Sequence, residues 1–250
     1  MSEHGERADG MSQPSVADAD PPSAPAVIAK GIRMVGPWGP VYGPLDLTIP
    51  AGGVSVLVCP AGTSRDALLL TIAGRMKPKS GELTVLGATR AKDIFVRCGL
   101  AGIDGLDTVS ESVTVRDLIT EQLRWDASWY RFIRQARQAE LVRVCAPVFG
   151  DLPLPPLMEY FEQLSELDQL LLRISLANTR KPQMLVVGNL DFVTSDLNRD
   201  LLIARLVDLG NTQTVVTATV NGVAEHAVRA QIPVPNTDRA ELVESQKHKG

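Results

Sequence analysis

The residues of this chain that could bind a ligand are concentrated in the segment Cys59–Asp66, whose sequence is CPAGTSRD. The segment follows Val54–Val58, a run typical of a strand covered on both faces, and it precedes an apolar stretch with helical spacing. A glycine-containing loop between a strand and a helix can bind phosphate, because backbone N–H groups and the positive end of the helix dipole point at the ligand. The candidate binding residues are therefore Gly62, Thr63, Ser64, Arg65, Asp66 and Ala67.

Several of these residues differ from the phosphate-binding pattern Gly-x-x-x-x-Gly-Lys-Ser/Thr, in which the lysine binds phosphate and the hydroxyl binds magnesium. Cys59 and Ser64 stand at the two glycine positions, Arg65 replaces the lysine, and Asp66 replaces the hydroxyl residue. A carboxylate about 4 Å from a phosphate charge costs about 4 kcal/mol at an effective dielectric of about 20, which is about a thousandfold in affinity. Magnesium bound by Asp66 would offset part of this cost.

The hydrophobic pattern predicts the elements that position this loop. Apolar and β-branched runs predict strands, and stretches with helical spacing predict helices. Strands that alternate with helices indicate an α/β fold with a mainly parallel sheet. The Pro/Gly-rich stretch 36–44 predicts turns around an early hairpin. The predicted strands are 45–49, 54–58, 81–86, 184–187 and 214–220, and the predicted helices are 68–72, 114–125, 128–144, 157–178 (interrupted near Ser165) and 198–209.

The composition bounds the class of protein. The 250 residues suffice for one domain with a sizeable core, and a net charge of -4 argues against broad nucleic-acid binding. Three widely spaced cysteines predict buried thiols in a reducing compartment rather than a disulfide framework or a zinc site. Neither a run of about 20 apolar residues nor a secretory signal is found, so a cytoplasmic protein is expected. The predicted organisation is a disordered polar tail over 1–26, one domain over 27–240 with a helical subdomain at about 106–165, and a flexible tail over 241–250.

An ordered set of short motifs extends over roughly residues 27–230. Gly52-Gly53 precedes the loop strand, Ser80–Gly87 has the sequence SGELTVLG, and Ser112–Leu118 has the sequence SVTVRDL. Leu164–Asp168, LSELD, stands at the place of an LSGGQ signature. Together these motifs resemble the ATP-binding subunits of ATP-binding cassette (ABC) transporters, and the chain is identified as a degenerate member of that family.

The resemblance implies a fold, cofactors and partners. The expected fold is the P-loop NTPase-type ABC ATPase fold, which has a mainly parallel central sheet, an antiparallel β subdomain and a helical subdomain. The implied cofactors are ATP and magnesium. The implied partners are a transmembrane permease-type subunit and a second ABC ATPase subunit, which would hold the chain at the inner face of the membrane.

Other positions also depart from the family pattern. Gly188 stands at the Walker B aspartate, Asn189 at the catalytic glutamate, and Ile103 at the glutamine that contacts magnesium. Val220 stands at the switch histidine, and Glu166 and Leu167 replace the signature glycines. We therefore predict neither catalytic residues nor a metal site, although a shifted magnesium role for Asp191 is an alternative. Ser165 is the retained signature residue, and local capping of a helix is its simpler role. Trp38 and Tyr42 are the candidates for stacking on adenine.

Three functions remain open at this point. The first is a non-hydrolysing or regulatory cassette subunit beside a membrane partner, the second an active but atypical ATPase that uses Arg65 and Asp191, and the third a nucleotide-independent scaffold. A surface question also stays open for the segment 125–137. Its aromatic residues, Trp125, Trp129, Tyr130 and Phe132, are predicted to pack in the core, with an exposed docking surface as the alternative. Its arginines, Arg131, Arg134 and Arg137, are predicted to form a solvated helix face, with a membrane partner or lipid headgroups as the alternative ligand.

Overall fold

The computed structural model describes residues 24–103, 112–130, 132–223 and 228–234. The predicted polar tail lies outside the described residues up to residue 23, and the predicted tail 241–250 lies outside them entirely. Arg131, one of the arginines of the predicted solvated helix face, is also outside the described residues.

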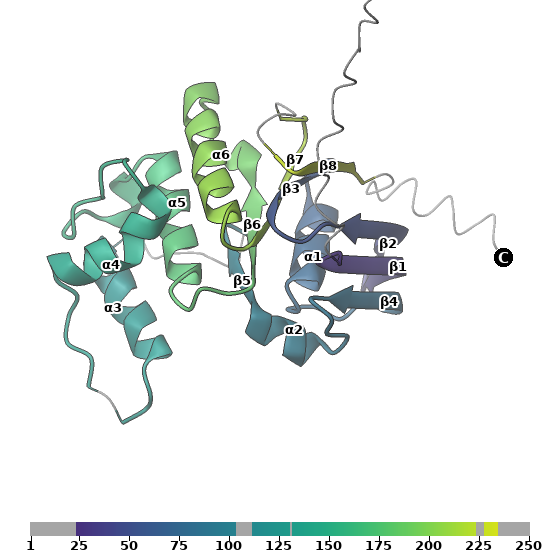
Figure 1. Ribbon diagram of the computed structural model, residues 1–250, viewed down its shortest axis with the longest axis horizontal. Coiled ribbons are helices and arrows are strands. Elements are labelled where there is room, and N and C mark those ends of the chain that lie inside the picture. Colours follow the sequence, from purple (N-terminus) through teal and green to yellow (C-terminus); the bar gives the residue numbers. More distant parts are fainter. Residues whose placement is uncertain (1–23, 104–111, 131, 224–227, 235–250) are drawn as a thin grey trace, which may run out of the picture.

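Two β-sheets form the framework of the molecule (Figure 1). The first sheet is antiparallel with the order β2-β1-β4, and the second is parallel with the order β5-β6-β7-β3-β8. The strands are β1 (Val27–Gly36), β2 (Gly39–Ile49), β3 (Gly53–Val58), β4 (Ser80–Val85), β5 (Cys98–Ala101), β6 (Met184–Asn189), β7 (Thr214–Thr219) and β8 (Ala230–Pro233).

The helices lie in two groups on opposite faces of the parallel sheet. Helix α1 packs between the two sheets, while α3 to α6 form a helical layer on the other face, in which α5 and α6 contact the strands and α3 and α4 pack on these helices (Figure 1). The helices are α1 (Thr63–Ile72), α2 (Ala91–Arg97), α3 (Val115–Asp126), α4 (Gln138–Phe149), α5 (Glu166–Ala177) and α6 (Asp196–Gly210), with short 3-10 turns η1 (Phe161–Gln163) and η2 (Leu190–Phe192). The predicted α/β fold with a mainly parallel central sheet, an antiparallel β subdomain and a helical subdomain is confirmed.

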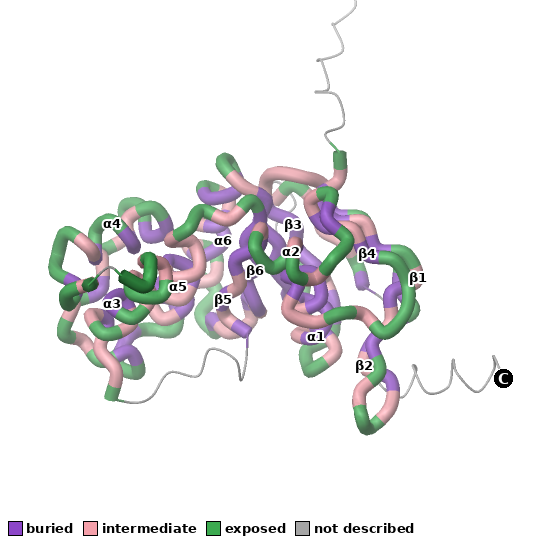
Figure 2. Tube along the Cα trace, turned by 90° about the horizontal axis from the view of Figure 1, so that it is seen from below, coloured by how far each residue is buried: buried purple, intermediate pink, exposed green. Residues whose placement is uncertain are grey.

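Each central strand contributes to both cores, because successive side chains of a strand point to opposite faces. In β3, Val56 belongs to the core beneath the helical layer and Leu57 to the core around α1. In β6, Val187 and Val186 divide in the same way. These strands are buried on both faces (Figure 2), as the β-branched runs of the sequence predict.

The predicted helix 128–144 begins only at Gln138. Residues 128–130 and 132–137 are not helical, which corrects the prediction. The cause is local hydrogen bonding. The Ala136 N–H donates to the Thr120 hydroxyl of α3 at 2.9 Å, which holds the chain out of helical geometry. The Glu140 carboxylate then accepts from the Arg137 N–H at 2.9 Å and caps the helix where it does begin.

The predicted helix 157–178 is likewise wrong before Ser165, apart from the short turn η1. The N–H groups of Val115 and Arg116 donate to the carbonyl groups of Glu159 and Leu157. The Phe161 N–H donates to the Val113 carbonyl at 2.9 Å. These bonds place residues 157–161 alongside the start of α3 as turns with a single bridge between Tyr160 and Thr114, which a pattern based on helical spacing cannot reveal.

Candidate functional site

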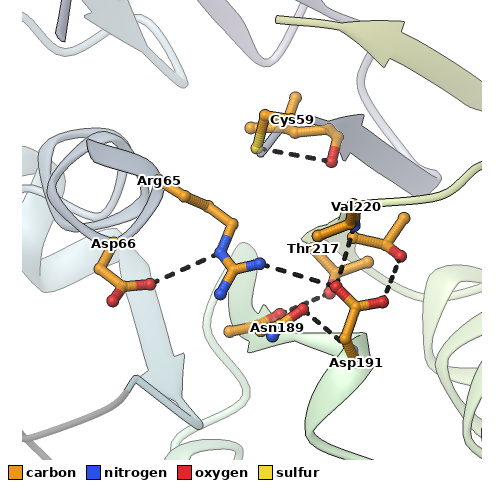
Figure 3. A network of polar contacts seen from close by, with 10 residues as sticks. Cys59, Arg65, Asp66, Asn189, Asp191, Thr217 and Val220 are labelled. Carbon is orange, nitrogen blue, oxygen red and sulfur yellow. Dashed lines mark hydrogen bonds and ion pairs between the residues drawn. The ribbon is translucent and has the colours of Figure 1, made fainter. Parts of the chain in front are cut away.

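The candidate loop lies where three parallel strands end. Cys59 follows β3, Asp191 lies just after β6, and Val220 follows β7. Because the strands run parallel, their carboxyl ends meet at one edge of the sheet, the usual place for ligands in such folds. Figure 3 shows the side chains of Arg65, Asp66 and Asp191 converging there. The structure therefore brings together the loop and Asp191, which are separated by more than a hundred residues in the chain.

The first turn of α1 is open to solvent. Gly62 is the N-cap residue and has a φ of 129°, a conformation that favours glycine, and no side chain caps the helix there. Gly62 and Thr63 are exposed, and Ser64 is half-buried. Ala67 packs in the core around α1. Of the predicted binding residues, Gly62, Thr63 and Ser64 thus present the helix N-terminus, and Ala67 has a structural position.

Arg65 is a buried cation between two carboxylates. Its side chain is 3% exposed, its Nη1 atom lies 3.6 Å from Asp191 Oδ2, and its Nε atom lies 3.7 Å from Asp66 Oδ1. Neither nitrogen makes a hydrogen bond to the described residues. Both contacts are therefore charge pairs without hydrogen bonding, and the guanidinium points away from the open helix end toward β6 (Figure 3).

Asp191 is fixed in this arrangement by the strands beside it. Its Oδ1 atom accepts from the Thr219 hydroxyl at 2.7 Å, and its Oδ2 atom accepts from the Val220 N–H at 2.9 Å. Its own N–H donates to Asn189 Oδ1 at 2.9 Å. Both carboxylate oxygens are engaged within the protein. Asn189 and Val220, at the glutamate and switch-histidine positions, thus serve to hold the counterion of Arg65.

Gly188, the residue predicted to stand at the Walker B aspartate position, leaves no room for a side chain because the backbone closes the space. A Cβ atom on Gly188 would lie 1.7 Å from the carbonyl oxygen of Gly102. The Gly188 carbonyl accepts from the Thr217 hydroxyl at 2.8 Å, which fixes its orientation. Ile103, at the magnesium-contacting glutamine position, is 3% exposed and belongs to the core around α1. The sequence predicts the loss of these polar groups, but only the structure shows that Gly102 occupies the vacated space.

The polar side chains at the predicted signature segment, Ser165 and Glu166, form hydrogen bonds within the protein. The Ser165 hydroxyl accepts from the Asp168 N–H at 3.1 Å and donates to Asp168 Oδ2 at 2.8 Å, so the predicted capping role is confirmed. The Glu166 carboxylate accepts from the N–H and the hydroxyl of Thr194, at 2.9 and 2.8 Å. Two carboxylates therefore stand at the N-terminus of α5, where they oppose binding of a phosphate.

The two candidates for adenine stacking differ sharply in exposure. Tyr42 is wholly buried, and its hydroxyl donates to the Thr71 hydroxyl on α1 at 2.7 Å, so its ring is a core component. Trp38 lies in the turn between β1 and β2 and is 83% exposed. Of this pair, only Trp38 is exposed enough to contact a base.

The three cysteines are free and buried, as predicted. Burial raises the pKa of the Cys59 thiol to about 11, an effect that the Arg65 charge reduces and the two carboxylates reinforce. Cys59 is therefore a neutral packing residue of the loop at physiological pH rather than a nucleophile.

We expect the contact between Glu166 and Thr194 to contribute stability that is lost in acid. The hydrogen bonds from Thr194, the backbone N–H first, lower the pKa of Glu166. The contribution is fully present above the ordinary glutamate pKa of about 4.3 and is lost as the pH falls through the lower folded-state pKa. Urea unfolding of wild type and Glu166→Gln should give a constant difference between about pH 7 and about pH 5, and a shrinking one below about pH 4. Glu162→Gln, on the exposed side of η1, is the control, and a difference that grows in acid would contradict the expectation.

Comparison with known proteins gives partial sequence matches to ATP-binding proteins of ABC transporters. No family model matches the chain. It is 46% identical over 55 residues to the "Probable multidrug ABC transporter ATP-binding protein YbhF" of Escherichia coli K12, a match that covers 22% of this chain and 10% of that protein. It is 37% identical over 73 residues to the cytochrome c biogenesis ATP-binding export protein CcmA of Cupriavidus pinatubonensis, and this match covers 28% of this chain and 32% of that protein. The chain thus matches only about a tenth and about a third of the length of these relatives.

Solved structures with the same arrangement cover nearly the whole chain. The ATP-binding cassette MJ1267, in its ADP conformation, has a TM-score of 0.68 at 10% identity, with 89% of this chain and 94% of that chain covered. CbiO1 of Clostridium perfringens, part of the ABC transporter complex CbiONQ, has a TM-score of 0.65 at 12% identity, with 91% and 94% covered. At these identities the likeness concerns the fold.

Proposed function

We propose that this chain, which has the fold of an ABC-transporter ATP-binding domain and is similar in sequence to that family, is a non-hydrolysing cassette subunit of a membrane transport system. One observation carries the proposal: the Gly102 carbonyl occupies the space that a Walker B aspartate needs at Gly188. A cassette without that carboxylate lacks a magnesium ligand. Asn189 also cannot accept a proton from the attacking water.

The residues at the site do not fit a magnesium–ATP complex. The orphaned nitrogens of Arg65 suit an anion, but Asp66 and Asp191 already lie beside them. The phosphate chain would have to enter a site that holds two negative charges, without a hydroxyl at position 66 to bind a metal ion. Within the described residues no group of three metal-binding side chains comes together. ATP turnover is therefore not a step that this site supports.

The proposed partner is a transmembrane permease-type subunit, with a second ABC ATPase subunit as a further candidate. The comparison protein CbiO1 is part of such a transporter complex. No helix of the described residues has the length and apolar character needed to cross a bilayer. We propose that the partner holds the chain at the cytoplasmic face of the membrane.

The internal charge pair favours a nucleotide-independent scaffold as the second candidate function. Asp191 accepts two hydrogen bonds and faces Arg65, so it occupies the electrostatic role of a bound phosphate. The same engagement argues against an active but atypical ATPase, because Asp191 is already committed to Thr219, Val220 and Arg65.

Calorimetry and turnover assays with the purified chain test the proposal. We expect ATP with magnesium to bind more weakly than about 1 mM, and turnover to stay at background, because two carboxylates face the phosphates. Asp66→Ser should raise the affinity at least about tenfold, because it removes a charge worth about 3 kcal/mol at about 6 Å and a dielectric of about 20. Asp196→Ser removes an exposed carboxylate on α6 and is the matched control.

The outcomes separate the three functions. Binding by Asp66→Ser that disappears on adding Arg65→Ala supports a cassette with an impaired phosphate site. Turnover by the wild-type chain that Arg65→Ala abolishes would establish an active ATPase and refute the proposal. Absence of binding in every variant, Asp191→Asn included, would refute it in favour of the scaffold.

A further inference from the structure

Four exposed aromatic residues lie at the end of α3 and on the loop that joins α3 to α4. Figures 1 and 2 show this part of the backbone at the outer end of the helical layer. The exposed fractions are 73% for Trp125, 96% for Trp129, 72% for Tyr130 and 87% for Phe132. The predicted core packing of these residues is therefore wrong. For Trp129, Tyr130 and Phe132 the cause is that residues 128–130 and 132–137 are not helical, so these side chains are not directed onto a neighbouring helix. Trp125 lies on the exposed side of α3.

Arginines surround the same loop. A hollow of about 400 Å³ is lined by Arg116 and Arg124 of α3 and by Arg134 and Arg137 of the loop, and no carboxylate lines it. A second hollow of about 420 Å³ shares residues 132–135 and Arg137 with the first, and its lining adds Arg143 of α4 together with Asp126 and Glu140. We call these five arginines and the four exposed aromatic residues the aromatic–arginine surface.

Three carboxylates lie near this surface, against five arginines, and each makes contacts within the protein. Glu121 accepts from the Nε1–H of Trp125 at 3.4 Å. Asp126 pairs with Arg180 at 2.7 Å, and its Oδ1 atom also accepts from Gln122. Glu140 accepts from the Arg137 N–H. The Nε atom of Arg116 is buried and makes no hydrogen bond to the described residues. The surface therefore carries an excess of positive charge on a chain whose net charge is -4, so the cations are gathered rather than spread evenly.

The base of the loop is anchored. Ala136 is 2% exposed and donates its N–H to the Thr120 hydroxyl. Arg180 donates to the Trp125 carbonyl at 3.0 Å, which fixes the end of α3. The aromatic rings thus project from a held loop, with Trp129 and Tyr130 in an edge-to-face pair whose centroids are 6.0 Å apart.

We propose that the aromatic–arginine surface binds an anionic lipid membrane directly. Tryptophan and tyrosine rings favour the level of the lipid headgroups, because one part of the ring is apolar and the other is polar. Clustered arginines bind lipid phosphates and respond to the negative potential of the membrane surface. Rings that are exposed at a protruding end suit insertion into a soft, flat interface better than docking into a shaped protein groove. This role is independent of the nucleotide site.

Tryptophan fluorescence gives a direct test. The chain has three tryptophans, and Trp38→Phe leaves only Trp125 and Trp129 as reporters. We expect this variant to float with vesicles of equal parts phosphatidylglycerol and phosphatidylcholine and to show a blue-shifted emission. With pure phosphatidylcholine vesicles it should do neither.

Charge-neutral variants locate the binding surface. Arg134→Gln with Arg137→Gln should weaken binding to the anionic vesicles about 25-fold, because each cation near a membrane surface is worth about fivefold. Lys77→Gln with Lys79→Gln makes the same change in net charge at exposed sites near β4 and should leave binding within about twofold. Both pairs are exposed, and equal urea midpoints would show that the fold is kept.

Two results would overturn the proposal. Equal losses from both pairs would mean that net charge rather than this surface drives binding. A blue shift with soluble poly-glutamate but none with anionic vesicles would assign the surface to an acidic protein segment instead.

Discussion

Replacing Gly188 by aspartate should destabilise the fold by about 3 kcal/mol or more and should not create ATPase activity. The family pattern presents this substitution as a simple repair of the Walker B position. In the structure a Cβ atom there would lie 1.7 Å from the Gly102 carbonyl oxygen, and 2.5 Å from its carbon. Two backbone segments would have to separate, and the β5–β6 pairing that ends at Ala101 and Val187 would be strained.

Two variants distinguish this steric effect from the effect of charge. Gly188→Ala introduces only the Cβ atom. In urea unfolding it should already produce most of the loss of stability that is expected for Gly188→Asp. Asn189→Glu introduces the neighbouring carboxylate at a half-buried position and should cost much less. If Gly188→Asp unfolds at the wild-type urea concentration, then Gly102 moves freely and the aspartate position is open after all.

Asp191→Asn should lower the free energy of unfolding by about 3 kcal/mol, because breaking a buried pair leaves an uncompensated buried charge. Arg65 is 3% exposed and has Asp66 as its remaining partner, which places the cost at the lower end for such pairs. The asparagine keeps the shape of the side chain and one acceptor for Thr219 or Val220. The loss can be measured by urea unfolding at neutral pH.

A double-mutant cycle isolates the charge pair. Arg65→Met with Asp191→Asn should be more stable than Asp191→Asn alone, because the second change removes the stranded charge. Asp196→Asn is the control: its carboxylate is 87% exposed and pairs with Arg199, so it should change stability by less than about 0.5 kcal/mol. Additive effects of the two changes would mean that Arg65 and Asp191 do not interact.

Much of the fold follows from local sequence, and the misses have tertiary causes. The β-branched runs predict β3, β6 and β7, because buried parallel strands need apolar residues on both faces. Strand β5, with the sequence CGLA, carries no such run and is a strand through its pairing with β6. Strand β8 is four residues long and pairs with β3. Neither partner lies near in the sequence, so a local pattern cannot predict these strands.

The early hairpin shows how turn residues can mislead. The stretch 36–44 is rich in glycine and proline, yet β2 already begins at Gly39. Within this hairpin only Pro37 and Trp38 connect the strands. Gly43 has a φ of 80°, and a Cβ atom there would lie 2.1 Å from the Ile32 carbonyl, so this glycine permits close approach of the strands. A residue associated with turns serves here inside the sheet.

The site was predictable in its location but not in its contacts. The strand–loop–helix context predicts the position of Gly62 to Ala67, and helix-capping rules predict the bond between Ser165 and Asp168. The pairing of Arg65 with Asp191 depends on the order of strands in the sheet, which local sequence does not contain. The sequence does single out Asp191, but as a magnesium candidate rather than as the counterion of Arg65. That distinction requires the positions of Thr219 and Val220.

The strand order also has a consequence for the order in which the chain is made. Strand β3 lies between β7 and β8, and both are formed by later parts of the sequence than any other strand among the described residues. At typical synthesis rates, both edges of β3 stay unpaired for on the order of ten seconds after the strand leaves the ribosome. During that time an apolar segment suited to aggregation lacks its neighbours. The antiparallel sheet and α1 are complete by residue 85, long before β7 and β8 are made. They can cover one face of β3 in the meantime, but not its edges.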